Sequence, residues 1–224
     1  MKRLIDVIIS CLMLILLSPV YLMIAILVFF DLGWPIIYKQ RYPGLNEKLF
    51  TLYRFKTMNH EVDENGRLLP PDERLTKLGR FLKSYSLDDL PEFYNVLVGD
   101  MSLVGPRPVL IRSIPSKSRQ QVKRHSVRPG MTGWSQLQGQ GQLTWDEKYA
   151  LDLYYIEHQT LWFDFKIMVK SLVLLWIGKQ KKLVLMTSFF SSQFSNLNNN
   201  FDCLFHRWNR DILKFTMEVM SASK

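Results

Sequence analysis

The sequence predicts an α+β protein in which an N-terminal membrane segment precedes a compact, mostly helical domain with a small sheet. Residues 7–30 carry no charged side chain. Residues 35–55 contain short extended segments, and residues 76–157 contain several segments with apolar residues at helical spacing. The 224 residues suffice for one domain with an appendage, and a second full domain is not expected.

The composition favours an anionic partner and a reducing compartment. The formal net charge is +9 and the pI about 9.5, which suits nucleic acid, an acidic membrane surface or a phosphorylated substrate. Basic and aromatic residues are not interleaved as they are on nucleic-acid-binding platforms, so no nucleic acid is expected. Cys11 lies in the apolar run and Cys203 in a distant tail, so a disulfide between them is not expected.

The apolar run at residues 7–30 is long enough to enter or cross a bilayer, for which about 20 apolar residues suffice. A cleaved signal peptide would also have a basic start and an apolar run. This run is longer than a usual signal core and has no clear small-x-small cleavage site at its end. The segment is therefore expected to stay in the mature protein.

The residues alone leave two topologies open for this segment. Ser18-Pro19 lies in its middle, where proline removes a helical hydrogen-bond donor and causes a bend. Lys2 and Arg3 precede the run and further basic residues follow it, and basic residues prefer the cytoplasmic side of a membrane. A helix that enters, bends and returns to the same face satisfies both flanks. A kinked spanning helix is the alternative, which membrane proteins tolerate.

Local patterns place the remaining elements. Strands are expected at residues 35–38 and 49–55, helices at 76–85, 87–98 and 144–157, and a basic helical turn at 119–125. Loops are expected at 59–73, 105–115 and 128–133, which are rich in turn-forming residues. The helix at 144–157 opens with a capping box, Thr144-x-x-Glu147. Residues 161–177 are mostly apolar with interspersed charges, so they lie along a membrane surface or pack as a core helix.

Asp88 and Asp89 are the candidate catalytic pair. Ser86 is a good N-cap for the helix at 87–98, and acids in a first helical turn are favoured by the helix dipole. This structural role explains both acids without catalysis. In the functional interpretation the carboxylates, which point about 100° apart on a helix, divide the work. One attacks phosphorus, and the other holds a divalent cation on a diphosphate, for which Mg²⁺ is best suited.

Several cations are candidates for phosphate binding. Arg107 is fixed between Pro106 and Pro108, which suits a bidentate grip on phosphate, but the same donors could cap backbone carbonyls. Arg128, in the second Gly/Pro loop, has the same two interpretations. The other candidate cations are Lys56, Arg80 and Lys83, whose alternative role is solvation at the surface. No histidine or cysteine cluster has zinc-ligand spacing, and no P-loop or dinucleotide-binding motif is present.

Taken together, these motifs resemble the bacterial sugar transferases, the monotopic phosphoglycosyl transferases. The resemblance covers residues 2 to about 178 in the order of the family. It rests on Lys2-Arg3, the run broken at Ser18-Pro19, and the segments at 50–58 (FTLYRFKTM), 72–76 (DERLT), 86–91 (SLDDLP), 99–108 (GDMSLVGPRP) and 128–133 (RPGMTG).

The resemblance implies an enzyme that moves a sugar 1-phosphate from a UDP-sugar to polyprenyl phosphate and releases UMP. It implies a re-entrant helix in one leaflet of the bacterial inner membrane, bent at Ser18-Pro19, with the catalytic domain facing the cytosol. The reaction would be the first membrane step of a surface glycan, such as O-antigen, capsule, exopolysaccharide or a glycoprotein glycan. Downstream glycosyltransferases are then expected partners.

The resemblance also assigns roles to residues. Asp88 would be the nucleophile that forms a covalent phosphosugar intermediate, Asp89 would help to hold Mg²⁺, and the loop at 106–108 would bind phosphate. Two site residues depart from the family pattern. Asp89 stands where glutamate is usual, and Lys83 stands where arginine is usual, which keeps the charge but loses the bidentate fork.

The expected organisation has three parts: a membrane-inserted helix at 1–33, a cytosolic transferase domain at 34–180 and a divergent low-complexity tail at 181–224. The tail matches nothing in the family and is expected to be an extension or a read-through of a disrupted reading frame. A rival hypothesis is a non-catalytic module on the membrane surface that binds anionic lipid or a phosphorylated glycan carrier. Release of UMP that depends on a divalent metal separates it from the enzyme.

Overall fold

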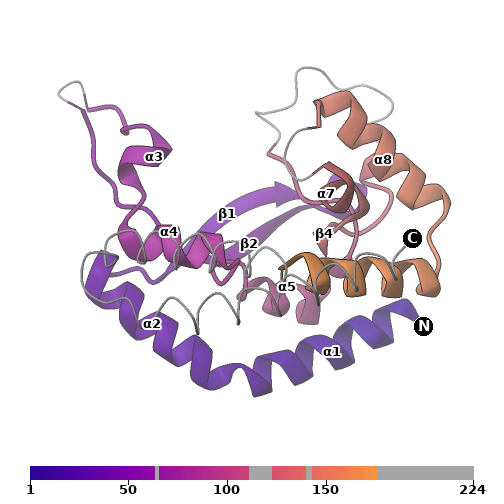
Figure 1. Cartoon of the computed structure of the whole chain (residues 1–224), viewed down its shortest axis with the longest axis horizontal. Helices are drawn as coiled ribbons and strands as arrows, with labels where there is room; N and C mark the ends of the chain where they lie inside the picture. The colour runs from indigo at the N-terminus through magenta and orange to yellow at the C-terminus, as the bar shows by residue number, and fades with distance from the viewer. Residues whose placement is uncertain (64–65, 111–122, 140–142, 176–224) are drawn as a thin grey trace, which may run out of the picture. The chain divides into compact units, whose positions relative to one another are not determined.

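The computed structural model describes residues 1–63, 66–110, 123–139 and 143–175, which form an α+β fold with two small sheets (Figure 1). The helices are α1 (Lys2–Leu16), α2 (Ser18–Leu32), the short 3₁₀ helix η1 (Leu45–Glu47), α3 (Pro71–Arg74), α4 (Lys77–Ser84), α5 (Glu92–Val98), α7 (Trp134–Gly139), α8 (Trp145–Glu157) and a further helix at residues 161–175. The strands are β1 (Ile37–Pro43), β2 (Leu49–Phe55), β3 (Ser102–Val104) and β4 (Gly130–Thr132). The predicted tail at 181–224 lies outside the described residues.

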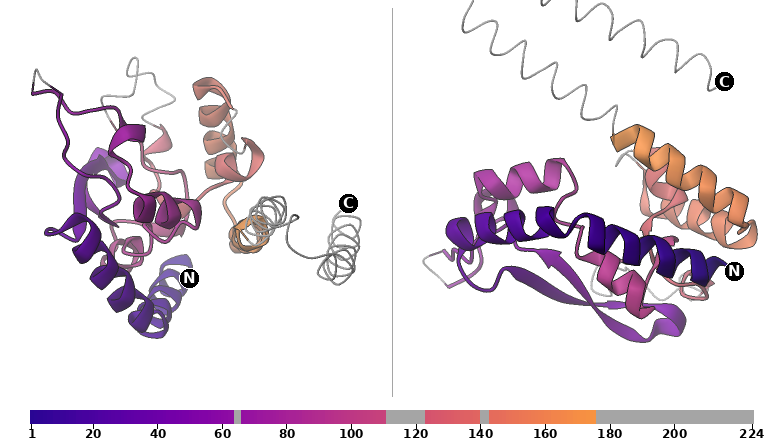
Figure 2. Two further views of the ribbon diagram at one scale, coloured as in Figure 1. Left: turned by 60° about the vertical axis from the view of Figure 1, so that its left-hand side comes forward. Right: turned by 90° about the horizontal axis from the view of Figure 1, so that it is seen from below.

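Helices α1 and α2 form one bent apolar arm along a side of the domain (Figures 1 and 2). Their axes differ by 62° across Leu17, which confirms the bend predicted at Ser18-Pro19. Pro19 lies in the first turn of α2, where a missing N–H breaks no helical hydrogen bond. The hydroxyl of Ser18 donates to the carbonyl of Ile15 over 2.8 Å, so the bend is closed by a local hydrogen bond.

The start of the apolar arm is bound to the domain by charged side chains. Lys2 Nζ donates to Asp164 Oδ2 over 2.5 Å and to the carbonyl of Val104 over 2.9 Å. Arg3 donates to the last carbonyls of α5, including that of Leu97 over 2.8 Å. Lys2 and Arg3, which the sequence predicts to flank a membrane segment, thus form hydrogen bonds within the protein.

The end of the apolar arm is bound to the same domain. Ile24 and Val28 are buried against Phe55 of β2 and Leu82 of α4. The ammonium of Lys56 donates to the carbonyl of Leu32, the last residue of α2, over 3.0 Å. Both ends of the arm are therefore fixed by contacts with one globular body.

Between its ends the apolar arm exposes large apolar side chains. Leu16 is 65% exposed, Leu22 64% and Phe30 81%. Within the described ranges no helix is by itself long and apolar enough to cross a bilayer, whereas α1 and α2 taken together meet that test on length and composition.

The fold contains two sheets, where one small sheet was predicted. Strands β1 and β2 form an antiparallel hairpin, and β3 and β4 form a parallel pair. The strand predicted at 35–38 is misplaced, because β1 begins at Ile37 and continues to Pro43 along its pairing with β2. The segment at 128–133 was predicted to be a loop, but its residues 130–132 form β4. Strands of three residues leave no periodic pattern in a sequence, and this pair depends on the close approach of Gly105 and Gly130. A Cβ on Gly130 would lie 2.1 Å from the Gly105 nitrogen.

The main core lies where the hairpin, α5, β3, α8 and the helix at 161–175 meet. Its most buried members are Leu52, Val96, Met101, Tyr155 and Ile167. The helix at 161–175 contributes Ile167 to this core but leaves Trp162 and Leu172 exposed. The prediction of a core helix is therefore confirmed for one face of this helix, whereas its position along a membrane surface stays a prediction.

Most predicted helices are confirmed. Helix α4 has Thr76 as its N-cap, and α8 opens with the predicted capping box of Thr144 and Glu147. The predicted loop at 59–73 is interrupted at its end by α3, and in the predicted turn at 119–125 residues 119–122 lie outside the described residues. The helix predicted to begin at Leu87 begins instead at Glu92.

Gly79 is a sharp test of this packing, because a Cβ at that position would lie 1.9 Å from the carbonyl oxygen of Thr57. We expect Gly79→Ala to lower the free energy of unfolding by about 1–3 kcal/mol, since α4 must move away from Thr57. Lys77→Ala, at an exposed position of the same helix, should change it by less than about 0.5 kcal/mol. Denaturant unfolding in detergent measures both, and equal stabilities would contradict the docking of α4.

Candidate active site

The acid pair lies in the turn that joins α4 to α5. The backbone nitrogen of Glu92 donates to the carbonyl of Asp89 over 2.9 Å, and that of Leu90 to the carbonyl of Leu87 over 3.3 Å. Bonds over three residues make this segment a series of tight turns. The two acids therefore precede the helix and do not lie in its first turn.

The predicted N-cap is wrong for a physical reason. Pro91 has no N–H to donate and disfavours the helical conformation at Leu90, so regular helix begins only after it. Pro91 itself is the N-cap of α5. Ser86 has a φ of 54°, the left-handed region, and forms the corner after α4. Its hydroxyl does not cap the helix.

Asp88 is the more enclosed acid and is 7% exposed. Its backbone carbonyl accepts from the nitrogen of Phe55 over 3.0 Å, which fixes the turn to the end of β2. Within the described part of the chain no cation lies within salt-bridge distance of its carboxylate. Burial and the charge of Asp89 raise the pKa of Asp88, partly opposed by the charges of Arg54 and Lys83.

Asp89 is held between two arginines. Its Oδ1 lies 3.0 Å from Arg54 Nε, and its Oδ2 lies 2.7 Å from Arg107 Nη2. Burial opposes ionisation of Asp89, but the charges of Arg107 and Arg54 outweigh it and lower the pKa of this carboxyl. The adjacent acids therefore have opposite environments.

Glu92 completes the cluster from the first turn of α5. Its Oε1 accepts from Arg54 Nε over 2.8 Å and from Arg54 Nη2 over 2.7 Å, and it lies 3.5 Å from Arg107 Nη2. The side chain is fully buried. Burial and the nearby charge of Asp89 raise the pKa of Glu92 to about 7, against the opposing charges of both arginines.

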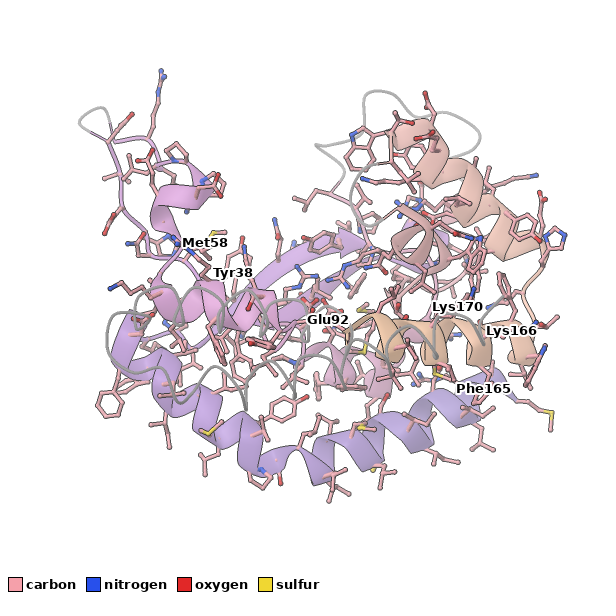
Figure 3. All side chains as sticks on the ribbon, in the orientation of Figure 1. Tyr38, Met58, Glu92, Phe165, Lys166 and Lys170 are labelled. Atoms are coloured by element: carbon pink, nitrogen blue, oxygen red, sulfur yellow. The ribbon has the colours of Figure 1, made fainter. Side chains whose placement is uncertain are left out.

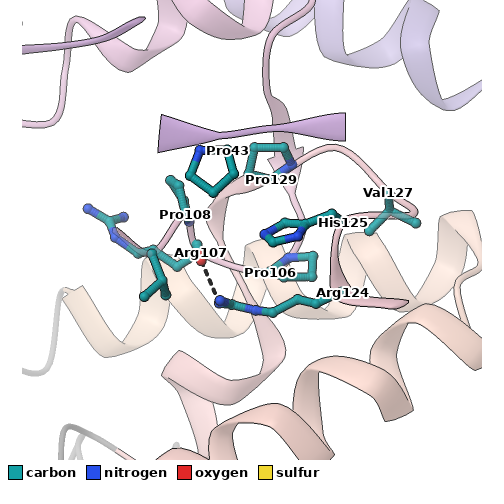
Figure 4. Close-up of a pocket in the computed structure, with 9 residues that line it drawn as sticks. Pro43, Pro106, Arg107, Pro108, Arg124, His125, Val127 and Pro129 are labelled. Atoms are coloured by element: carbon teal, nitrogen blue, oxygen red, sulfur yellow. Dashed lines mark hydrogen bonds between the residues drawn. The ribbon is translucent and has the colours of Figure 1, made fainter. Parts of the chain in front are cut away.

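A second buried network positions the loop of Arg107. Arg107 Nη1 donates to the carbonyl of Met131 over 2.7 Å. The carbonyl of Arg107 accepts from Arg124, as Figure 4 shows. Arg124 Nε donates to Asp152 over 2.7 Å, and so does the hydroxyl of Ser135. Beside this loop lies a small open pocket lined by Pro43, Pro106, Pro108, Arg124, His125 and Pro129.

The structure brings only some of the predicted cations to the acids. Arg107 contacts Asp89 directly, and Lys83, exposed on α4, lowers the pKa of Asp88 through its charge. Arg128 Nε instead donates to the carbonyl of Gly99 over 2.9 Å, in line with the carbonyl-capping interpretation. The ammonium of Lys56 donates to the carbonyl of Leu32 at the end of α2, and Arg80 is exposed on α4.

Two residues of the cluster, Arg54 and Glu92, were not predicted. Arg54 is a charged residue inside the predicted strand at 49–55, where a position facing solvent explains a charge equally well. Glu92 follows Pro91 and reads as an ordinary acid near a helix start. The available signal was that both residues lie within or directly beside motifs of the family, at 50–58 and 86–91.

The residues present fit a divalent cation only if a bound substrate supplies further oxygen ligands. Among the described residues no group of three or more His, Cys, Asp or Glu side chains could hold a metal ion. Mg²⁺ usually takes one or two carboxylates and completes its shell with phosphate oxygens and water. Asp88 and Asp89 supply such carboxylates, so any such site requires the oxygens of a bound diphosphate.

Comparisons with known proteins identify relatives. The family described as "Bacterial sugar transferase" matches residues 1–178. An "Uncharacterized sugar transferase EpsL" of Bacillus subtilis is 43% identical over 168 residues, which cover 75% of this chain and 83% of that protein. "UDP-glucose:undecaprenyl-phosphate glucose-1-phosphate transferase" of Escherichia coli is 39% identical, over 75% of this chain and 38% of that protein.

A third relative is "Undecaprenyl-phosphate galactose phosphotransferase" of Salmonella typhimurium, which is 35% identical over 76% of this chain and 39% of that protein. The chain thus spans well under half the length of the Escherichia coli and Salmonella relatives.

The raised pKa of Glu92 predicts how stability depends on pH. A carboxyl with a raised folded-state pKa stabilises the fold fully below its ordinary value of 4.5, and this contribution is lost as the pH rises through about 7. Glu92→Gln cannot ionise, so its free energy of unfolding should rise relative to that of the parent protein across this window. Denaturant unfolding of both proteins at several pH values measures the difference, and a constant difference would contradict the environment described for Glu92.

Proposed function

Because this chain belongs to the bacterial sugar transferase family, we propose that it transfers a sugar 1-phosphate from a UDP-sugar to undecaprenyl phosphate and releases UMP. The names of the Escherichia coli and Salmonella relatives support the acceptor and the type of reaction. The observation that carries the proposal is the acid pair, with Asp88 free of salt bridges among the described residues beside an arginine-bound Asp89.

In the first step a carboxylate oxygen of Asp88 attacks the phosphorus that carries the sugar. The bond between this phosphorus and the bridging oxygen breaks, and UMP leaves with that oxygen. The sugar phosphate is then joined to Asp88 as an acyl phosphate. Asp88 has no salt bridge among the described residues, and burial together with the charge of Asp89 raises its pKa, so its carboxylate is more basic than that of Asp89 and the better nucleophile of the two.

In the second step a phosphate oxygen of undecaprenyl phosphate attacks the same phosphorus. The acyl phosphate bond breaks, Asp88 is regenerated as a carboxylate, and a lipid-linked diphosphosugar forms. This product contains one sugar, so enzymes that add further sugars are its expected users. We place the reaction at the start of a surface glycan such as O-antigen, capsule, exopolysaccharide or a glycoprotein glycan.

Arg54 and Arg107 would bind the diphosphate of the donor. Guanidinium groups form paired hydrogen bonds with phosphate oxygens, and both groups already bind an oxyanion in the form of Asp89. Asp89 and Asp88 would hold Mg²⁺, which supplies charge neutralisation on the diphosphate and the departing UMP. Asp89 is one methylene shorter than the usual glutamate, which changes the reach of the carboxylate that would hold the ion.

We further propose that the apolar arm enters one leaflet of the bacterial inner membrane and returns to the cytosolic face. Contacts at both ends support this topology. Lys2 and Arg3 bind β3, α5 and the helix at 161–175, while the end of α2 packs on α4. A spanning helix would place the two ends on opposite sides of the membrane, and one compact domain could not then contact both of them.

Asp88→Asn tests the nucleophile. We expect UMP release from the UDP-sugar to fall by roughly 10³-fold or more, because the amide cannot form the acyl phosphate. Parent enzyme given UDP-sugar without acceptor should release UMP in proportion to enzyme, and a chelator should suppress it. Asp100→Asn, in the turn after α5, is the matched control and should retain turnover. Near-full activity of Asp88→Asn would refute the assignment.

Cysteine labelling tests the topology. In a variant without Cys11 and Cys203, single cysteines inserted directly after Met1 and substituted at Trp34, which is 78% exposed, mark the two ends of the apolar arm. A membrane-impermeant maleimide added to spheroplasts should label neither position, because both lie on the cytosolic face, and should label both after lysis. Labelling of one end from outside would indicate a spanning helix.

A further inference from the structure

Glu92 is the buried acid that the proposed mechanism does not use. It is fully buried, and its carboxyl lies among the strand β2, the acid turn and the loop of Arg107 (Figure 3). An acid at a helix start normally faces solvent, where the helix dipole favours it without loss of hydration. A buried carboxyl loses that hydration and is retained only where buried partners replace it.

The partners of Glu92 are the two arginines that hold Asp89. Arg54 donates twice to Glu92 Oε1, over 2.8 and 2.7 Å, and reaches Asp89 with the same Nε over 3.0 Å. Arg107 lies 3.5 Å from Glu92 Oε1 and 2.7 Å from Asp89 Oδ2. The four side chains form a ring in which acids and arginines alternate.

We propose that Glu92 is a positioning residue of the active site, whose buried carboxyl orients Arg54, and by its charge Arg107, toward the phosphate oxygens of the donor. This inference rests on the proposed function. The two arginines depend on Glu92 unequally, because Arg107 is also anchored by its bond to the Met131 carbonyl over 2.7 Å. Arg54 is bonded only to Asp89 and Glu92 among the described residues, so it depends on Glu92 most.

The ring also explains how the arginines stay in place when the donor binds. Phosphate oxygens would compete with Asp89 for both guanidinium groups, and Asp89 is itself needed at the metal. Glu92 approaches the guanidinium of Arg54 along the edge that carries Nε and Nη2. A carboxyl there keeps the group oriented while its contacts to Asp89 are exchanged for phosphate.

A positioning role and a role through charge alone predict opposite changes in UDP affinity. Removing a negative charge beside a diphosphate site should tighten the binding of UDP if charge is all that matters. If Glu92 orients Arg54, then Glu92→Ala should weaken UDP binding in spite of the lost repulsion. Glu92→Gln should bind UDP at least as well as the parent, because its amide oxygen still accepts from Arg54.

The experiment measures UDP affinity by calorimetry, and kcat and KM for UMP release, on the full chain in detergent. For Glu92→Ala we expect kcat/KM to fall roughly 10- to 100-fold, the scale of one lost charge-assisted hydrogen bond, with KM raised. For Glu92→Gln we expect kcat/KM within about 5-fold of the parent, since the hydrogen bond is restored. Rates are given per folded enzyme, from thermal unfolding of each sample.

Asn95→Ala is the matched structural control. Asn95 is fully buried on α5 and binds the backbone of β2, through Tyr53 N over 3.1 Å and Thr51 O over 2.7 Å, without touching either arginine. It should lower the melting temperature and leave kcat and KM per folded enzyme within about 2-fold. Equal losses in Asn95→Ala and Glu92→Ala would show that Glu92 acts only on the fold and would overturn the proposal.

Two other results would overturn it. One is Glu92→Ala with UDP affinity and kcat/KM equal to or better than those of the parent. The other is Glu92→Gln as impaired as Glu92→Ala, which would make the charge and not the hydrogen bond essential. If the parent enzyme released no UMP, the proposed function would fail, and the UDP affinities of the variants would still decide whether Glu92 orients the arginines.

Discussion

The ion pairs that hold Asp89 between Arg54 and Arg107 fix three segments that are far apart in the sequence. Arg54 belongs to β2, Asp89 to the turn before α5, and Arg107 to the loop after β3. Partly buried pairs of this kind are costly to break, because the remaining charge loses both its partner and its hydration. The site is therefore a cross-link of the fold, and any change in one of its charges is felt by the other segments.

The same cluster separates two adjacent carboxylates that are chemically alike. Asp89 receives both arginines and its pKa is lowered, whereas Asp88 is enclosed without a salt bridge among the described residues and its pKa is raised. The ionised form of Asp89 is therefore stabilised, whereas Asp88 binds a proton more strongly than an ordinary aspartate. This asymmetry comes from position alone, and it agrees with a division into a metal-holding acid and a nucleophile.

The apolar arm shows how charges that flank an apolar segment can stabilise the fold. Lys2 binds Asp164 and the Val104 carbonyl, directly before the loop of Arg107, and Arg3 binds the end of α5, the helix that starts with Glu92. The first turn of the arm thus contacts the residue that leads into the loop of Arg107 and the end of α5 that lies away from Glu92. Insertion of the arm in a membrane would hold the acid turn at a fixed distance from the lipid surface.

The bent apolar helix, α4, α8 with its capping box, strand β2 and the acid pair with the loop of Arg107 could be predicted from the sequence, because each depends on a local pattern or a contiguous motif. The start of α5 was misplaced because Pro91 outweighs the capping preference of Ser86. The β3–β4 pair, the partners of Lys2 and Arg3, and the contacts of Arg54 and Glu92 became evident only in the folded chain. The carboxyl of Glu92 lies against a residue 38 positions away, and no local pattern records which distant side chain a buried charge will meet.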